Sequence, residues 1–155
     1  KLQEAAEQFA QARQFIEASQ VLSDKAKESS LGTVLFGEVE LALAKKDVTA
    51  AKTLAEKFKQ YAESTKSPVD MQSWHNLLGQ IALFEKRYDD AITEFDQASK
   101  RWPHIYYLMG LAYAGKGDKT KAQESLNTAI NFNETGFDNA FYRVRSLNAM
   151  KELEL

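Results

Sequence analysis

One stretch of the sequence has a glycine spacing that could hold a phosphate group. Residues 110–116 read Gly-Leu-Ala-Tyr-Ala-Gly-Lys and satisfy the G-x4-G-K pattern of nucleotide-binding loops. Such a loop follows a β-strand and carries Ser or Thr after the lysine, where the hydroxyl binds magnesium. Here Gly117 takes that place, Gly110 falls within a helical pattern, and no strand pattern precedes it. We therefore interpret the stretch as the end of a helix and its turn, not as a nucleotide site.

The other residue types that carry chemistry are sparse. The two histidines, His75 and His104, are not four residues apart, and we expect them to be partly solvated surface residues without a metal. Asp89 and Asp90 are adjacent in a predicted turn, where helix capping explains them better than acid–base catalysis. The absence of cysteine excludes disulfides, thiolate nucleophiles, iron–sulfur clusters and cysteine-based zinc sites. We predict a protein that is not an enzyme and that needs no cofactor or metal.

Composition narrows the class of protein further. The 155 residues include 20 basic and 22 acidic side chains, and the charges are interspersed along the chain. Nucleic-acid binding requires a concentrated Lys/Arg footprint, so we expect no nucleic-acid partner. No apolar run approaches the roughly 18 residues of a membrane span, so we expect no membrane insertion of this segment. Only 7 Gly and 2 Pro occur, which favours long helices joined by short loops.

Two consecutive stretches show the same helix–turn–helix design. In residues 73–103, large apolar residues at helical spacing predict a first helix, and residues 86–90 predict a tight turn whose Asp caps the second helix. That second helix carries Ala91, Phe95 and Ala98 on one face, and Pro103 ends it or begins the next. The following stretch repeats the pattern with these residues: Tyr106, Met109, Gly110, Tyr113, Ala122, Leu126 and Ala129.

These two stretches resemble the tetratricopeptide repeat. The repeat is recognised by Leu-Gly and aromatic residues in its first helix, then Ala-x3-Phe-x2-Ala and a later Pro. The first stretch matches through Leu78, Gly79, Ala91, Phe95, Ala98 and Pro103, although Ala82 replaces an aromatic residue. The second matches through Gly110, Tyr113, Ala122 and Ala129, with Leu126 in place of Phe. The resemblance implies an all-α fold, an α-α superhelix (solenoid) of stacked antiparallel helical hairpins with about three repeats plus flanking helices.

The match is weaker outside these stretches. Residues 31–44 and 48–62 predict a degenerate hairpin, because Gly37 is out of step with Gly79 and Gly110. Residues 2–27 are helical, either as one long helix or with a break near Ser19. Residues 63–68 are the most loop-like stretch of the chain, and Asp138 is a plausible cap for a last helix.

We expect one tetratricopeptide-like domain over residues 1–155. Within it, residues 1–66 hold degenerate repeats, residues 72–104 and 104–136 hold the clear repeats, and residues 137–152 form a C-terminal capping helix. Small residues such as Gly79, Gly110 and Ala91 would let paired helices approach closely. A capping helix needs a wetter outer face, which three basic residues suit: Arg143, Arg145 and Lys151.

The resemblance also indicates where function would lie. In that family the first helices of successive hairpins line a concave groove that holds extended or helical peptides. We therefore predict a non-catalytic protein- or peptide-binding scaffold, whose partner the sequence does not identify. The candidate groove residues are Asn76, Gln80, Phe84, Tyr107, Leu111, Phe141 and Arg145. Because no Lys lies five residues before Asn or Gln on these faces, the carboxylate clamp of chaperone-tail receptors is disfavoured.

Two questions stay open from the sequence. A structural or oligomerisation domain of a larger protein is the alternative function, with self-association of the chain as its consequence. The chain opens with Lys1 and has no initiator Met, so we expect a trimmed chain or a mature fragment. The sequence does not determine the compartment: a cytoplasmic location is favoured, and a bacterial periplasmic one stays open if a signal peptide was removed.

Overall fold

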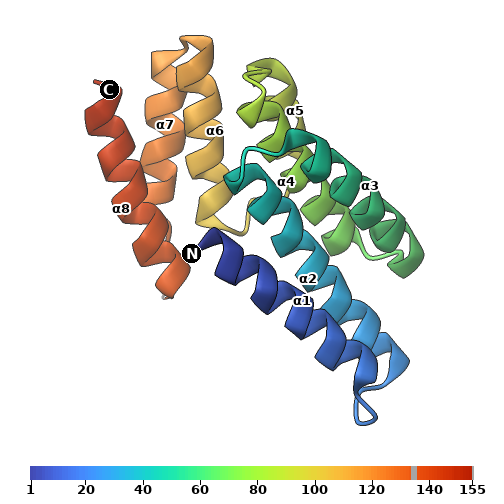
Figure 1. Ribbon diagram of the computed structural model, residues 1–155. Coiled ribbons are helices and arrows are strands. Elements are labelled where there is room, and N and C mark those ends of the chain that lie inside the picture. The colour runs from blue at the N-terminus through green and yellow to red at the C-terminus, as the bar shows by residue number, and fades with distance from the viewer. Residues whose placement is uncertain (134–135, 155) are drawn as a thin grey trace. The chain divides into compact units, whose positions relative to one another are not determined.

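The computed structural model describes residues 1–133 and 136–154, and within these residues the chain forms eight α-helices and no β-strand (Figure 1). The helices are α1 (Leu2–Ala18), α2 (Asp24–Ala44), α3 (Val48–Thr65), α4 (Pro68–Phe84), α5 (Tyr88–Gln97), α6 (Pro103–Lys116), α7 (Lys119–Ile130) and α8 (Phe137–Glu152). Consecutive helices pack in pairs, so the predicted all-α helical-repeat fold is confirmed. The chain divides into two compact units, Lys1–Leu77 and Leu78–Leu155.

Three hairpins turn in the same way, although the sequence of the first is degenerate. In each turn the residue before the second helix's N-cap has left-handed backbone, with φ of 62°, 61° and 88° at Lys46, Lys86 and Gly117. The N-cap N–H then donates to a carbonyl five residues earlier at 2.9 Å, as between Asp47 and Ala42. The left-handed residue and this hydrogen bond together end the first helix and satisfy one of its last carbonyls. The second helix can therefore begin at the next residue. The hairpins are α2–α3, α4–α5 and α6–α7.

Small residues let the paired helices approach closely. A fully buried alanine lies four residues after each N-cap, at Ala51, Ala91 and Ala122. A Cβ atom added to Gly79 would lie 2.5 Å from the Phe95 ring, and one added to Gly110 would lie 2.6 Å from Leu126. The close packing predicted at both glycines is therefore confirmed, since each makes room for a large side chain of its partner helix.

Three local expectations differ from the structure, and one open alternative is decided by it. Within residues 63–68 only Lys66 and Ser67 lie outside a helix, because α3 continues to Thr65 and α4 begins at Pro68. Of the two alternatives left open for residues 2–27, the structure has the break near Ser19, since α1 ends at Ala18 and Ser23 caps α2. Asp89 and Asp138 do not cap helices. Each lies in the first turn of its helix, where its carboxylate interacts favourably with the helix dipole.

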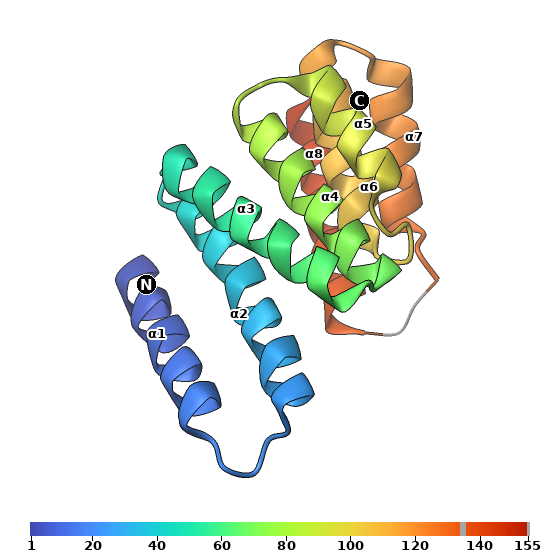
Figure 2. The ribbon, with the colours of Figure 1, turned by 90° about the vertical axis from the view of Figure 1, so that its right-hand side faces the viewer.

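In the first unit, α2 packs against α1 on one side and against α3 on the other (Figure 2). A Cβ atom added to Gly37 would lie 2.5 Å from the Phe9 ring, so this glycine accommodates α1 and not the helix of its own hairpin. A salt bridge of 2.7 Å between the Arg13 guanidinium and the Glu38 carboxylate joins the same two helices. Gly37 is therefore out of step with Gly79 and Gly110 because it has a different neighbour.

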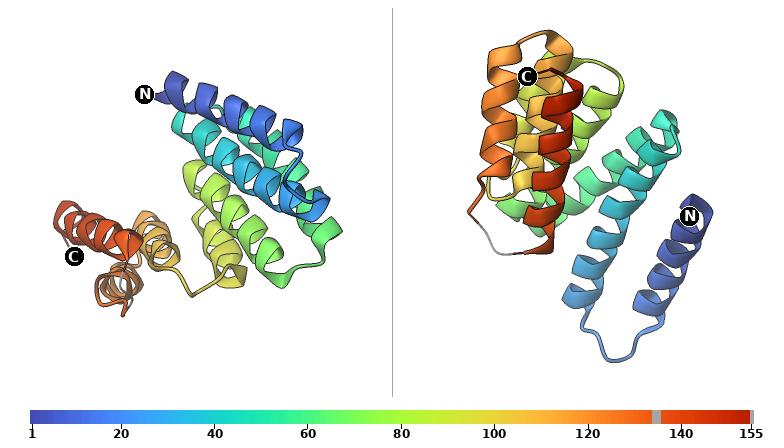
Figure 3. Two further views of the ribbon diagram at one scale, coloured as in Figure 1. Left: turned by 90° about the horizontal axis from the view of Figure 1, so that it is seen from below. Right: turned by 90° about the vertical axis from the view of Figure 1, so that its left-hand side faces the viewer.

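In the second unit, α6 is the central helix and contacts α5, α7 and α8, while α8 also lies beside α7 (Figure 3). One buried cluster joins Phe95 to Ile105 and Met109, and a second joins Tyr107, Leu126 and Ala149. Within the described part of the chain, none of the helices combines the length and apolarity that a membrane span requires.

Candidate peptide-binding site

Four of the seven candidate groove residues come together between α6 and α8. Tyr107 and Leu111 lie one turn apart on α6, and Phe141 and Arg145 lie one turn apart on α8. The Arg145 guanidinium carbon lies 5.2 Å from the centroid of the Tyr107 ring and 5.2 Å from that of Phe141. Two aromatic rings therefore hold the cation by cation–π attraction and limit its side-chain freedom.

A pocket opens beside this cation. Its volume is about 280 Å³, and its lining includes Tyr107, Leu111 and Arg145. The remaining lining residues come from α8 and the residue that follows it: Asn148, Ala149, Glu152 and Leu153. The pocket thus combines an apolar wall with an amide, a carboxylate and a guanidinium, a set of groups suited to a polypeptide with both apolar and polar side chains.

Arg145 is available to an incoming anion. Among the described residues it forms no ion pair, whereas Arg87 and Lys116 each bind an aspartate. The N–H donors of a guanidinium lie in its own plane, and a carboxylate can accept two of them side by side. The site therefore offers one oriented cation at the edge of a small pocket.

The aromatic contacts continue from the site to the start of α6. The ring centroids of Tyr142 and Tyr107 lie 5.7 Å apart, and those of His104 and Tyr142 lie 5.6 Å apart. Burial lowers the pKa of His104 from 6.5 to about 4, although the carboxylate of Asp138 acts in the opposite direction. His104 is thus neutral at pH 7, and its side chain is half-buried, in keeping with the partly solvated residue that the sequence predicts.

The other three candidates lie on α4. Asn76 belongs to the first unit and is almost buried, so its amide offers little surface to a ligand. Gln80 and Phe84 belong to the second unit, where Gln80 is half-buried and Phe84 is exposed. Neither lines the pocket beside Arg145. The site described here therefore rests on α6 and α8.

Sequence reasoning missed Asn148 and Glu152. The signal that could have found them is the helical spacing from residues already nominated, since Phe141, Arg145, Asn148 and Glu152 follow one face of α8. Tyr142 and His104 gave no such signal, because their contact joins two helices that are distant in sequence. Only the packing of α8 on α6 places them near Tyr107.

The repeated hairpins and the site on successive first helices define a helical-repeat protein. Residues 103–135 match the family model of the tetratricopeptide repeat, over the hairpin that contains Tyr107 and Leu111. This hairpin is therefore similar to the tetratricopeptide repeat, and the paired helices of the rest of the chain are consistent with a helical-repeat solenoid. No curated protein and no solved structure matched the chain. This similarity supports a protein–protein interaction module in general terms.

Proposed function

We propose that the chain is a non-catalytic module that binds a peptide segment of a partner protein on the first-helix face formed by α6 and α8. The observation that carries this proposal is the Arg145 guanidinium, held by two aromatic rings at the edge of a pocket and without an ion pair among the described residues. Arginine and aromatic residues are the types that most often dominate binding energy in protein interfaces.

The chemistry of the pocket limits what the segment carries. The guanidinium favours a carboxylate, from an acidic side chain or from the end of a peptide. Leu111 and the Tyr107 ring favour an apolar side chain next to it. We therefore propose a segment with one acidic group and one neighbouring apolar residue as the ligand.

Replacing Arg145 with Ala is expected to weaken binding of such a segment about tenfold or more, because the variant lacks the only oriented cation of the pocket. Peptides can be selected from a displayed random library on the intact chain, and their Kd values measured by fluorescence anisotropy. Arg145→Lys keeps the charge but loses the planar donors, and it should recover only part of the affinity.

Arg143 provides the matched control, since it is an exposed arginine on the same helix and does not line the pocket. Arg143→Ala should change the Kd less than about twofold. Equal Kd values for the wild-type chain and Arg145→Ala would show that the selected peptides bind elsewhere, and the assignment of the site would then be wrong.

A second candidate function, self-association, is favoured by the outer surface of α8. Beside the three basic residues expected of a capping helix, this surface exposes apolar side chains: Phe137 (85%), Val144 (57%), Phe141 (44%) and Leu147 (42%). Side chains at this spacing follow one face of a helix, and a helix–helix contact would bury them.

Val144→Glu tests this second candidate. If α8 joins two copies, sedimentation velocity should show a dimer that the variant converts to monomer, since a buried unpaired carboxylate opposes association. Thr128→Glu on α7, at another exposed position, should leave the dimer intact. A wild-type chain that stays monomeric at high concentration would exclude self-association through this face.

A further inference from the structure

One pocket of the first unit combines aromatic rings with a carboxylate, and none of the features above uses it. It lies where α2, α3 and α4 meet, and its volume is about 240 Å³. Of its lining residues, Thr33 is exposed and Phe58 is only 3% exposed, so the pocket joins the solvent to a buried ring. This volume is below that of pockets for drug-sized ligands, and it suits a single side chain or a small ion. We call this feature the Asp70 pocket.

Three aromatic rings line the Asp70 pocket. The ring centroids of Phe36 and Phe58 lie 5.8 Å apart with 71° between the ring planes, and those of Phe58 and Tyr61 lie 5.4 Å apart with 61°. Successive rings are therefore steeply inclined to one another and do not stack flat. Gly32 makes room for them, since a Cβ atom there would lie 2.3 Å from the Tyr61 ring. The aromatic lining is thus part of the packing of α3 on α2.

Two hydroxyl groups of the Asp70 pocket are left as hydrogen-bond acceptors. The Thr33 hydroxyl donates to the Ser29 carbonyl at 3.2 Å, and the Ser73 hydroxyl donates to the Val69 carbonyl at 3.0 Å. A hydroxyl has one proton and two lone pairs, so each oxygen can still accept but has no proton left to donate. These two acceptors come from different helices, α2 and α4.

The charge of the pocket is negative. Among the described residues that line it, Asp70 alone carries a charge, and its carboxylate forms no ion pair within the described chain. It accepts a bond of 2.7 Å from the neutral Thr65 hydroxyl. Burial raises the pKa of the Tyr61 hydroxyl, and the Asp70 carboxylate raises it further. A hydrogen bond with the Ser29 side chain lowers this pKa, and the Glu28 carboxylate raises it. The two charges that act on Tyr61 are therefore both negative.

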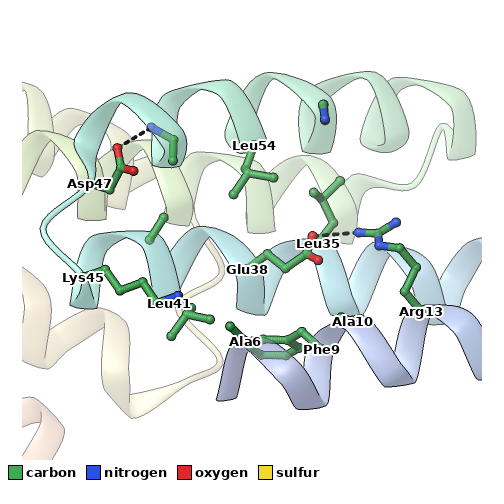
Figure 4. Close-up of a pocket in the computed structure, with 13 residues that line it drawn as sticks. Ala6, Phe9, Ala10, Arg13, Leu35, Glu38, Leu41, Lys45, Asp47 and Leu54 are labelled. Carbon is green, nitrogen blue, oxygen red and sulfur yellow. Dashed lines mark hydrogen bonds and ion pairs between the residues drawn. The ribbon is translucent and has the colours of Figure 1, made fainter. Parts of the chain in front are cut away.

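A larger hollow in the same unit differs in this respect. It lies between α1, α2 and α3, and its volume is about 520 Å³. Figure 4 shows the salt bridge between Arg13 and Glu38 on its wall. Lys45, Asp47 and Lys57 add further charges of both signs to its lining. The charges of this hollow therefore select no ligand, whereas those of the Asp70 pocket do.

We propose that the Asp70 pocket binds a primary alkylammonium group, carried by a lysine side chain or by a free aliphatic amine. An ammonium group has three donors and no acceptor, which matches acceptors on two helices: Asp70 and Ser73 on α4, and Thr33 on α2. Its charge is attracted by the carboxylate and by aromatic rings. A guanidinium donates in one plane only and fits such acceptors less well. The inference goes beyond the proposed function, because it concerns the other unit and a ligand of opposite charge.

The test titrates the isotope-labelled chain of 155 residues with Nα-acetyl-lysine N-methylamide and follows the backbone amides of Gly32 and Tyr61 by NMR. The norleucine counterpart lacks only the ammonium group, the arginine counterpart carries a guanidinium, and n-butylamine has the side chain without the backbone. The lysine derivative should bind with a Kd on the order of 1 mM, as expected for a single side chain. The norleucine derivative should bind at least about tenfold more weakly, and the arginine derivative about threefold.

Two variants locate the binding. Asp70→Asn keeps the size of the side chain and an acceptor for Thr65 but removes the charge, so it should weaken the lysine derivative about tenfold. Asp24→Asn is the matched control, because Asp24 also lies in the first turn of a helix and does not line the pocket. Its Kd should change less than about twofold. Phe36→Leu keeps an apolar wall without the ring, and it should weaken the lysine derivative about threefold to tenfold and leave the norleucine derivative unchanged.

Several results would overturn the proposal. Equal Kd values for the lysine and norleucine derivatives would show that the pocket does not recognise the charge, and so would equal values for the wild type and Asp70→Asn. Tighter binding of the arginine derivative would identify a guanidinium as the ligand. If the lysine derivative binds more tightly than n-butylamine, the source is a polypeptide, and otherwise it is a free amine. Arg145→Ala should bind the lysine derivative normally, so failure here and failure of the site on α6 and α8 are distinguishable.

Discussion

Combining Gly79→Val with Phe95→Ala is expected to cost less stability than the two changes cost when each is made alone and the costs are added. Gly79→Val forces a side chain against the Phe95 ring and should cost about 1–3 kcal/mol. Phe95→Ala empties a fully buried site and should cost about 3–5 kcal/mol. The double variant should be more stable than the sum of these costs implies, by about 1–3 kcal/mol, because the valine fills space that the phenylalanine leaves.

The first hairpin gives the physical reason for this expectation. Counted from the N-caps Asp47 and Arg87, Val39 takes the place of Gly79, and Ala55 takes the place of Phe95. Val39 and Ala55 are both buried, so the same turn accommodates the large residue on its first helix and the small one on its second. The first hairpin thus fills the space between its two helices with the opposite arrangement, the larger residue on its first helix and the smaller one on its second.

Urea denaturation of the wild type, the two single variants and the double variant gives the coupling directly. The milder cycle of Gly79→Ala with Phe95→Leu serves if a single variant does not fold. Gly79→Val combined with Leu126→Ala is the matched control, because Leu126 faces Gly110 in the next hairpin, and these two costs should add. Additive costs for Gly79→Val and Phe95→Ala would show that the two positions do not share one space.

The free energy of unfolding is expected to fall by about 3 kcal/mol as the pH drops from about 7 towards 4, through the single residue His104. Burial lowers the pKa of His104 from 6.5 to about 4 in the folded chain. Between these values the unfolded chain binds a proton that the folded chain does not. The contribution of neutral His104 to the free energy of unfolding is therefore complete above the pKa of the unfolded chain. It is lost as the pH falls towards the pKa of the folded chain.

Replacement of His104 with Gln should flatten this pH dependence, because glutamine does not titrate. Urea denaturation of both proteins at pH 7, 6, 5 and 4 measures the difference in slope. Asp138→Asn should not flatten it, since the carboxylate raises the pKa of His104 and its removal leaves the ring still harder to protonate. Identical slopes for the wild type and His104→Gln would show that the ring stays hydrated in the folded chain.

Much of the fold could be predicted because its signals are local. Ala91, Phe95 and Ala98 recur at helical spacing after a turn, and that spacing alone places them on one helix face. The first hairpin is degenerate in sequence because Gly37 is out of step with Gly79 and Gly110, yet Asp47 and Ala51 stand four apart, as Asp118 and Ala122 do. In the structure the first hairpin matches the others in turn geometry and in the burial of this alanine.

Local signals were ambiguous where the same residues are compatible with a helix and with a break. Residues 63–68 are rich in polar residues and contain Pro68, yet Pro is well accommodated in the first turn of a helix, and α4 begins there. The break between Ala18 and Asp24 follows from Ser19 and Ser23, whose hydroxyls bind backbone N–H groups of the connecting segment and the start of α2. Serine hydroxyls compete with helical bonding, but the sequence did not show whether they prevail here.

The sequence by itself determined the helices, the turns and the recurrence of small residues that lets neighbouring helices pack, because these depend on spacing within a few turns of one chain segment. Only the tertiary structure decided that Gly37 meets Phe9, that His104 lies half-buried beside Tyr142, and that Arg145 lies over the Tyr107 ring. Desolvation and ring contacts arise between helices that are distant in sequence, and a pattern along the chain does not encode which surfaces meet.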